Sequence, residues 1–253
     1  MSKFRRTGTE LGFVNRNDPT SAIFLIVLLL ILSGAFTGGH RLPPGKTIVT
    51  VLVSFLISVS IHEFMHAYTA WKLGDDTAKN LGRLTLNPAA HFDPYGFFGF
   101  IMISLGYSFI GWGKPVPVNM AYLRGGIEQK RRSMALVAVA GPISNIVQAT
   151  AVAIPLRWGN TGGLEFYLQT YFYVNVLQAA FNMIPIPPLD GSKVLMGILP
   201  NFWYPVLAPL QQYGFMLLFL IFFIGNRLSS SGGTIASAMY SPLVDLLYRT
   251  LLP

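Results

Sequence analysis

Two histidines and a glutamate in residues 60–68 (SIHEFMHAY) are the side chains of this sequence best suited to chemistry. On a helix, His62 and His66 stand about 40° apart around the axis and roughly 6 Å apart along it, so both imidazoles can reach one metal ion. Glu63 lies beside them, where its carboxylate can accept a proton from water. The HExxH pattern therefore predicts a metal site with an adjacent general base.

The composition places this stretch in a membrane protein. Of 253 residues, 52% are hydrophobic and 11% charged, with a mean hydropathy of +0.51; a soluble domain carries roughly a quarter charged residues. Ionisable side chains at membrane depth are costly and usually face an interior site. The chain has no cysteine, so a metal would take His, Asp or Glu ligands. Because the net charge of +8 comes from short loops between apolar runs, we expect no nucleic-acid partner.

Six apolar runs are candidate spans: residues 21–36, 48–71, 95–112, 133–155, 166–188 and 206–224. A span needs about 20 residues, and the run 95–112 is short and holds four glycines. We expect a cytoplasmic segment at 1–20, a membrane-embedded domain at 21–224, and at 225–253 a tail that is either interfacial or a marginal last helix.

The positions of Lys and Arg distinguish two topologies. If all six runs cross, 10 of these residues lie inside and 8 outside; if residues 95–112 enter the membrane and return, 13 lie inside and 5 outside. The second count follows the positive-inside tendency. We therefore predict an all-α, multi-pass membrane protein with five to six transmembrane helices, a re-entrant segment and a cytoplasmic N-terminus.

The stretch between the second run and the re-entrant segment holds further polar residues. Alternation in residues 81–86 predicts a short membrane-associated β-hairpin or strand, and prolines keep residues 113–118 (GKPVPV) extended. His91 and Asp93 could support the metal ligands or contact substrate, but turn chemistry explains them about as well.

Asp190 is the best candidate for the third ligand that a hydrolytic zinc site typically requires. It follows the run 166–188, and the prolines of IPIPPLDG must break that helix just before it. In the re-entrant topology the runs that carry His62 and Asp190 both approach the cytoplasmic face, whereas with six spans they end on opposite faces. The alternative role for Asp190 is to cap a helix that begins near Ser192.

Four stretches together resemble the site-2 protease family of intramembrane zinc metalloproteases, in a short form without a PDZ or CBS domain. They are HEFMH (62–66), GRLTLNPAAHFDPYG (82–96), AGPISN (140–145) and NMIPIPPLDG (182–191). The resemblance implies a small membrane-embedded helical core with adjoining strands, in a prokaryotic cell membrane. It also implies one zinc ion bound by His62, His66 and Asp190, with Glu63 as the catalytic base and Asn182 as an oxyanion donor.

The activity implied by this resemblance is cleavage of transmembrane segments of single-span membrane proteins near the cytoplasmic side, in regulated proteolysis or clearance of signal-peptide remnants. Any regulator would be a separate protein. One rival is a non-catalytic zinc-binding membrane protein such as a transporter, which has no need for Glu63. Another is a protease of soluble peptides, and a burial depth of about 20 Å argues against it.

Plainer roles are available to several of these polar residues. Asn182 could bridge helices, as polar residues in bilayers often do. Gly141 and Asn145 are expected to serve helix packing near the site. The alternative for Asn145 is that it supports a metal ligand or contacts substrate. The cluster at residues 130–132 (KRR) is expected to set topology and to contact lipid headgroups.

Overall fold

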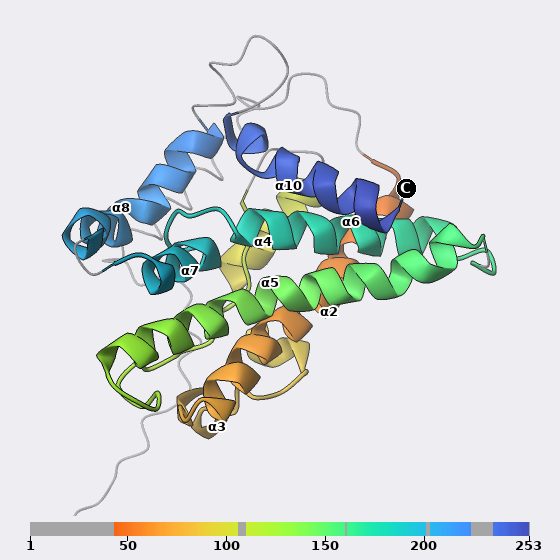
Figure 1. The fold of residues 1–253 in the computed structure, drawn as a ribbon. Helices are drawn as coiled ribbons and strands as arrows, with labels where there is room; N and C mark the ends of the chain where they lie inside the picture. Colours follow the sequence, from red (N-terminus) through yellow and green to blue (C-terminus); the bar gives the residue numbers. More distant parts are fainter. Residues whose placement is uncertain (1–42, 106–109, 160, 201–202, 224–234, 253) are drawn as a thin grey trace, which may run out of the picture. The chain divides into compact units, whose positions relative to one another are not determined.

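The structure is a computed structural model that describes residues 43–105, 110–159, 161–200, 203–223 and 235–252. Its elements are α2 (Gly45–Lys72), α3 (Thr77–Asn80), the 3-10 helix η1 (Pro88–His91), α4 (Pro94–Ser104), α5 (Ile127–Arg157), α6 (Glu165–Asn182), α7 (Asp190–Ile198), α8 (Tyr204–Phe223) and α10 (Ile235–Leu251) (Figure 1). Within these ranges the protein is all-helical. The predicted segment 1–20 and the predicted span 21–36 lie outside the described residues.

Helices α2 and α5 are long and apolar enough to cross a membrane. At 1.5 Å per residue they measure about 42 and 46 Å, more than the roughly 30 Å hydrocarbon core. They pack side by side and run in opposite directions (Figure 1). Alanines on the shared face, among them Ala67 and Ala138, are buried and let the two backbones approach closely.

The polarity of α2 is reversed relative to a helix of a soluble protein. Its buried face carries polar residues at intervals of four: Thr50, Ser54, Ser58, His62 and His66. Its exposed face carries Val49, Val53 and Ile57. Polar groups turned inward and apolar groups turned outward are the arrangement expected of a helix in lipid.

The remaining long helices complete the bundle around this pair. Helix α6 packs against both α2 and α5, and α7 packs against α5. A cluster of buried residues on α5 and α6, including Ala149 and Phe172, is covered by Val244 and Leu247 of α10. The tail beyond residue 224 thus contributes a helix that packs onto the bundle.

The chain that follows helix α4 turns back and runs alongside it, so both ends of this segment lie close together. With 11 residues, α4 is about 16 Å long, too short to cross a bilayer. A Cβ on Gly96 would lie 1.8 Å from the carbonyl oxygen of Trp112, and Gly99 is similarly close to that returning segment. The amide of Lys114 then donates to the carbonyl of His91, 2.9 Å away, just before α4 begins. This is the path predicted for a re-entrant segment; its place in a membrane stays a prediction.

The β-hairpin or strand predicted for residues 81–86 is wrong, because these residues form turns and bends. Gly82 takes a φ of 68°, and the amide of Arg83 donates to the carbonyl of Ala78 at 2.8 Å, which turns the chain back onto α3. The Arg83 side chain is buried and donates to the carbonyl of Lys114. The alternation reflects contacts with other loops, and no strand ladder forms here.

Candidate metal centre

His62, His66 and Asp190 converge in the interior of the bundle. The two histidines are 3% and 7% exposed, and their Nε2 atoms lie 3.0 Å apart on one face of α2. Asp190 is the first residue of α7, and its Oδ2 lies 3.2 Å from His62 Nε2 and 3.1 Å from His66 Nε2. The structure thus brings together the three predicted ligands, although Asp190 lies 124 residues after His66.

Hydrogen bonds at the opposite ring nitrogens fix the tautomers of both histidines. His66 Nδ1 lies 2.7 Å from the carbonyl of Val137 and must donate to it. His62 Nδ1 lies 2.6 Å from Asn145 Oδ1, and Asn145 uses its Nδ2 to donate to Ser58 Oγ, so here too the imidazole is the donor. In the neutral ring each Nε2 is then an unprotonated acceptor.

Three acceptor atoms within 3.2 Å of one another repel unless a cation lies among them. The residues present fit that requirement: tetrahedral zinc with ligand distances of about 2.0–2.1 Å places its ligand atoms roughly 3.3 Å apart. Two imidazoles and one carboxylate form a ligand set found in catalytic zinc sites, which keep a fourth position open. By geometry and by donor chemistry, His62, His66 and Asp190 could therefore hold a metal ion, and we call them the metal-ligand group.

Comparison with known proteins finds relatives that are named as zinc metalloproteases. "Putative zinc metalloprotease YwhC" of Bacillus subtilis (strain 168) is 33% identical over 184 residues, which cover 69% of this chain and 80% of that protein. "Putative zinc metalloprotease Rip2" of Mycolicibacterium smegmatis is 29% identical over 210 residues, 79% of each chain. The chain belongs to this family of zinc metalloproteases. No family model and no solved structure matches the sequence.

Gly141 of the metalloprotease lets α5 lie against the metal ligands. A Cβ at this position would stand 2.4 Å from His66 Nε2 and 2.6 Å from His62 Cε1. Asn145 follows one turn later on the same helix and is fully buried. Asn145 has contacts that fit both predicted roles. Its Oδ1 accepts from His62 Nδ1, and its Nδ2 donates to Ser58 of α2 and to Asn175 of α6.

Asp190 reaches the histidines because α6 ends eight residues earlier. Helix α6 ends at Asn182, and turns lead to α7, which begins at Asp190 itself and not near Ser192. A Cβ on Gly191 would lie 2.2 Å from the carbonyl oxygen of Met183, so glycine permits this tight return. The helix break predicted from the prolines is confirmed. The alternative role, capping of a helix by Asp190, is not observed, since Leu189 is the N-cap of α7.

Glu63 and Asn182, the two predicted catalytic residues, have different surroundings. Glu63 is buried, and its Oε2 accepts a hydrogen bond from the amide of Val116 at 3.0 Å. Asn182 is half-buried at the end of α6, and its Nδ2 donates to the carbonyl of Gln178 on its own helix at 3.1 Å. In this conformation the Asn182 amide is turned toward its own backbone.

His91 and Asp93 have structural partners. Asp93 caps α4, and its Oδ1 accepts from the amide of Gly96 at 2.8 Å, as the turn interpretation predicted. His91 is 1% exposed and donates from Nε2 to the carbonyl of Thr85 at 2.7 Å. Burial lowers the pKa of His91, so this imidazole is neutral at neutral pH. Neither residue joins the metal-ligand group.

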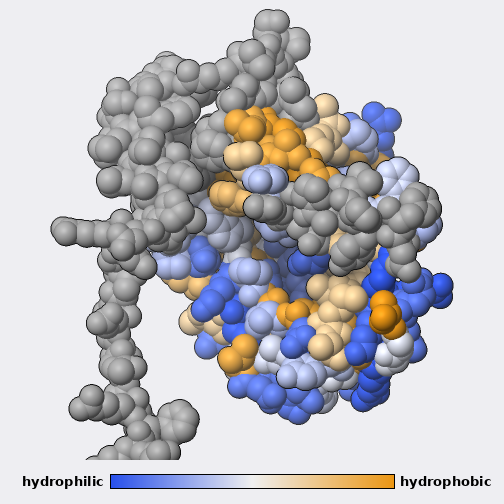
Figure 2. All heavy atoms as spheres, turned by 90° about the vertical axis from the view of Figure 1, so that its left-hand side faces the viewer, coloured by the Kyte–Doolittle hydropathy of each residue, from blue (hydrophilic) through white to orange (hydrophobic). Residues whose placement is uncertain are grey.

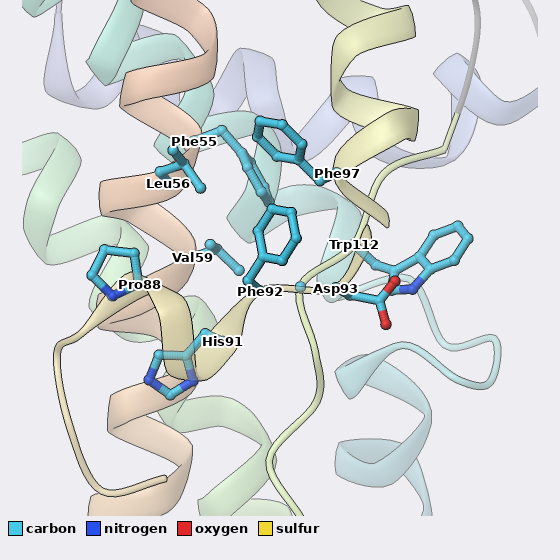
Figure 3. Close-up of a pocket in the computed structure, with 10 residues that line it drawn as sticks. Phe55, Leu56, Val59, Pro88, His91, Phe92, Asp93, Phe97 and Trp112 are labelled. Atoms are coloured by element: carbon cyan, nitrogen blue, oxygen red, sulfur yellow. The ribbon is translucent and has the colours of Figure 1, made fainter. Parts of the chain in front are cut away.

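An apolar pocket lies beside α2, one turn before Glu63. It lies between α2, η1 and the segment that returns from α4, with Leu56, Val59 and Trp112 among its lining (Figure 3). Its cavity volume is about 10 Å³, close to the minimum that one water molecule needs. Val59 stands one turn before Glu63, and a Cβ on Gly113 would lie 3.8 Å from Glu63 Oε1.

Arg131 contacts the end of α7, the helix that begins at Asp190, and the sequence interpretation missed this contact. The expected contact with lipid headgroups is wrong for this residue, because its guanidinium is buried and donates to the carbonyls of Met196 (2.7 Å) and Leu199 at the end of α7. A signal was present in the sequence: Arg131 lies seven residues before Ala138 and fourteen before Asn145, so all three share one face of α5.

Proposed function

We propose that this metalloprotease is an intramembrane zinc endopeptidase of the site-2 protease type, acting on transmembrane segments of single-span membrane proteins near the cytoplasmic side. The observation that carries the proposal is the burial of the ligand pair within an apolar helix. His62 lies about 26 Å along α2 from Gly45, well past the middle of a roughly 30 Å hydrocarbon core. A soluble peptide would have to enter the bilayer to reach it.

The residues around the metal-ligand group have distinct roles in peptide hydrolysis. When bound by His62, His66 and Asp190, zinc supplies a Lewis acid that lowers the pKa of water and polarises the scissile carbonyl. Glu63 takes the proton of the attacking water and returns it to the leaving amine. After rotating away from its own helix, Asn182 donates to the tetrahedral oxygen, an effect worth roughly 3 kcal/mol.

The distribution of charge supports a cytoplasmic site. In Figure 2 hydrophilic residues gather over the lower part of the face and hydrophobic residues over its upper part. Exposed charged side chains of α3 and of the start of α5, such as Lys79 and Arg132, lie at the end of the bundle where α2 ends at Lys72. Positive loops favour the cytoplasm, so we propose that this end lies on the cytoplasmic side. With the span predicted at residues 21–36, the N-terminus of the chain is then cytoplasmic as well.

Purified protein in detergent tests the activity. We expect one zinc per chain and cleavage of members of a panel of single-span substrates by the wild type. Glu63→Gln should keep zinc and lose cleavage, because only the base is removed; Asp190→Ala should lose zinc as well. Equal cleavage by the wild type and Glu63→Gln would reject the mechanism, and a wild type that binds zinc but cleaves nothing would favour a transporter or other non-catalytic protein.

Cysteine labelling tests the topology, since the natural chain has no cysteine. Gly126 caps the start of α5, and Gly162 lies exposed in the connection from α5 to α6. We expect Gly126→Cys to react only from the cytoplasm and Gly162→Cys only from the outside. The reverse pattern would reject the proposed orientation, and labelling of both from one side would reject α5 as a span.

A further inference from the structure

Residues 113–119 (GKPVPVN), which we call the strap, run past the candidate base and are held at both ends. At the first end, the amide of Lys114 donates to the carbonyl of His91 at 2.9 Å. The buried guanidinium of Arg83 donates to the carbonyl oxygens of Lys114 (2.5 Å) and Pro115 (3.4 Å). Figure 3 shows the returning chain that leads into the strap from Trp112 beside α4.

The other end of the strap is held by Asp75, a carboxylate with no exposed surface. Its Oδ2 accepts from the amide of Asn119 at 2.6 Å, while its Oδ1 accepts from the amide of Thr77 at 2.9 Å. Asp75 lies just beyond α2, which ends at Lys72, and its amide donates to the carbonyl of Ala70 on α2 at 2.9 Å, so the strap is tied to the helix that carries Glu63. Hydrogen bonds to an ionised carboxylate are among the stronger ones in proteins.

Between these two ends, one strap amide contacts the site. The N–H of Val116 donates to Glu63 Oε2 at 3.0 Å. Pro115 and Pro117 flank Val116 and have no N–H, so a shift of the strap by one residue in either direction would leave Glu63 without a donor. The same prolines keep the strap extended and restrict its motion.

We propose that the Val116 amide is a positioning group that fixes Glu63 for proton transfer; this rests on the proposed role of Glu63 as the base. The contact ties down Oε2 and leaves Oε1 for water. Gly113 lets the strap lie against α2, because a Cβ there would stand only 2.5 Å from Val59 Cγ2. Holding a catalytic group in its reactive geometry before substrate arrives is a recognised source of rate.

Three residues outside the metal-ligand group share one function, which is to hold the strap in place. Arg83, His91 and Asp75 touch neither the metal ligands nor, through any hydrogen bond, Glu63 itself. Each holds part of the strap in register. They are positioning residues that act on Glu63 through the backbone of the strap, and the Arg83 guanidinium also attracts the Glu63 carboxylate by its charge.

Substitution of Val116 by proline removes the amide donor while retaining an extended backbone. In the zinc-loaded protein we expect Val116→Pro to lower kcat roughly 10- to 100-fold, the range for a lost hydrogen bond to a charged group, with KM and zinc content unchanged. Val116→Ala keeps the N–H and should retain kcat within about twofold. Wild-type kcat in Val116→Pro, together with an inactive Glu63→Gln, would overturn the strap proposal and leave the proposed function intact.

Met120→Pro is the matched control for adding a proline nearby. Met120 is the second residue of a turn closed by the amide of Tyr122 and the carbonyl of Asn119 (3.1 Å), a position that favours proline. We expect normal kcat. An equal loss of kcat in Met120→Pro and Val116→Pro would show a general effect of proline and overturn the proposal.

A spectroscopic measurement tests the contact without activity and without a proline variant. In protein labelled with ¹⁵N-valine, the Val116 amide resonance is identified by its absence in Val116→Ala. We expect Glu63→Ala to shift this resonance upfield and to speed its exchange with solvent, because the carboxylate acceptor is gone. An unchanged Val116 resonance would contradict the contact, whether or not the protein cleaves any substrate.

Discussion

The two sides of the site are built in different ways. On the metal side, His62, His66 and Asp190 belong to packed helices, and α5 orients the two imidazoles through the Asn145 side chain and the Val137 carbonyl. On the base side, Glu63 is held by a backbone amide of the non-helical strap. Metal binding and proton transfer therefore depend on separate parts of the chain. Substitutions should therefore impair one of them while sparing the other.

The largest effect on the metal side is expected from Gly141→Ala. The new methyl group would stand within 2.6 Å of both imidazoles, so the rings or α5 must move. We expect zinc affinity to fall roughly 100-fold or more, the upper range for overpacking a tight site. Competition titration with a chelator measures it. Gly126→Ala, where a Cβ meets nothing within 4 Å, is the control, and equal affinity in the two variants would contradict the packing argument.

Asn145→Ala should have the next largest effect. It removes the acceptor that fixes the tautomer of His62, and loss of such partners typically weakens metal binding roughly 10- to 100-fold. The same titration measures the affinity. Thr150→Ala, an exposed polar position on the same helix, serves as control. If zinc affinity stays at the wild-type value in Asn145→Ala, helix packing is the main role of this residue.

Arg131→Ala tests whether α7 must be held at its far end for Asp190 to bind metal. We expect zinc affinity to fall roughly fivefold, since only part of the stabilisation from charged hydrogen bonds at Met196 and Leu199 reaches Asp190. The neighbouring Arg132, whose side chain is 73% exposed, is the matched control. If Arg132→Ala loses as much zinc affinity as Arg131→Ala, the loss comes from the change in net charge and not from the contact with α7.

On the base side, Asp75→Asn should give the smallest effect and a different pattern. It replaces the acceptor for the Asn119 amide and loosens the far end of the strap. We expect kcat to fall about threefold with zinc affinity unchanged, because most strap contacts remain. Asp76→Asn, a side chain that is 59% exposed, should behave like wild type. Loss of zinc in Asp75→Asn would erase the distinction between the two sides.

Sequence reasoning was strongest where chemistry follows from side-chain type and local spacing. HExxH placed His62 and His66 on one face of a helix, and the prolines before Asp190 indicated where α6 ends. Tertiary contact decided the rest. Arg131 is charged and near a predicted membrane surface, yet it points inward because the carbonyls at the end of α7 lie there.

The strap shows why the base side could not be predicted. Its contact with Glu63 uses a main-chain N–H, a group that nearly every residue carries, so the residue type of Val116 contains no signal for it. The alternation of residues 81–86 led to a wrong prediction, because a tertiary contact decides the structure there too. Arg83 faces inward to bind strap carbonyls, and an inward charge looks like the polar half of a strand pattern.

The central claim is that a helix near the start of the described chain and a carboxylate far along it share one zinc ion. The direct test is zinc stoichiometry and affinity for the wild type, His62→Ala and Asp190→Ala, purified without chelators and checked for folding by circular dichroism. The account predicts one zinc per wild-type chain and a large loss of affinity in each variant. Full zinc affinity in folded Asp190→Ala would contradict it.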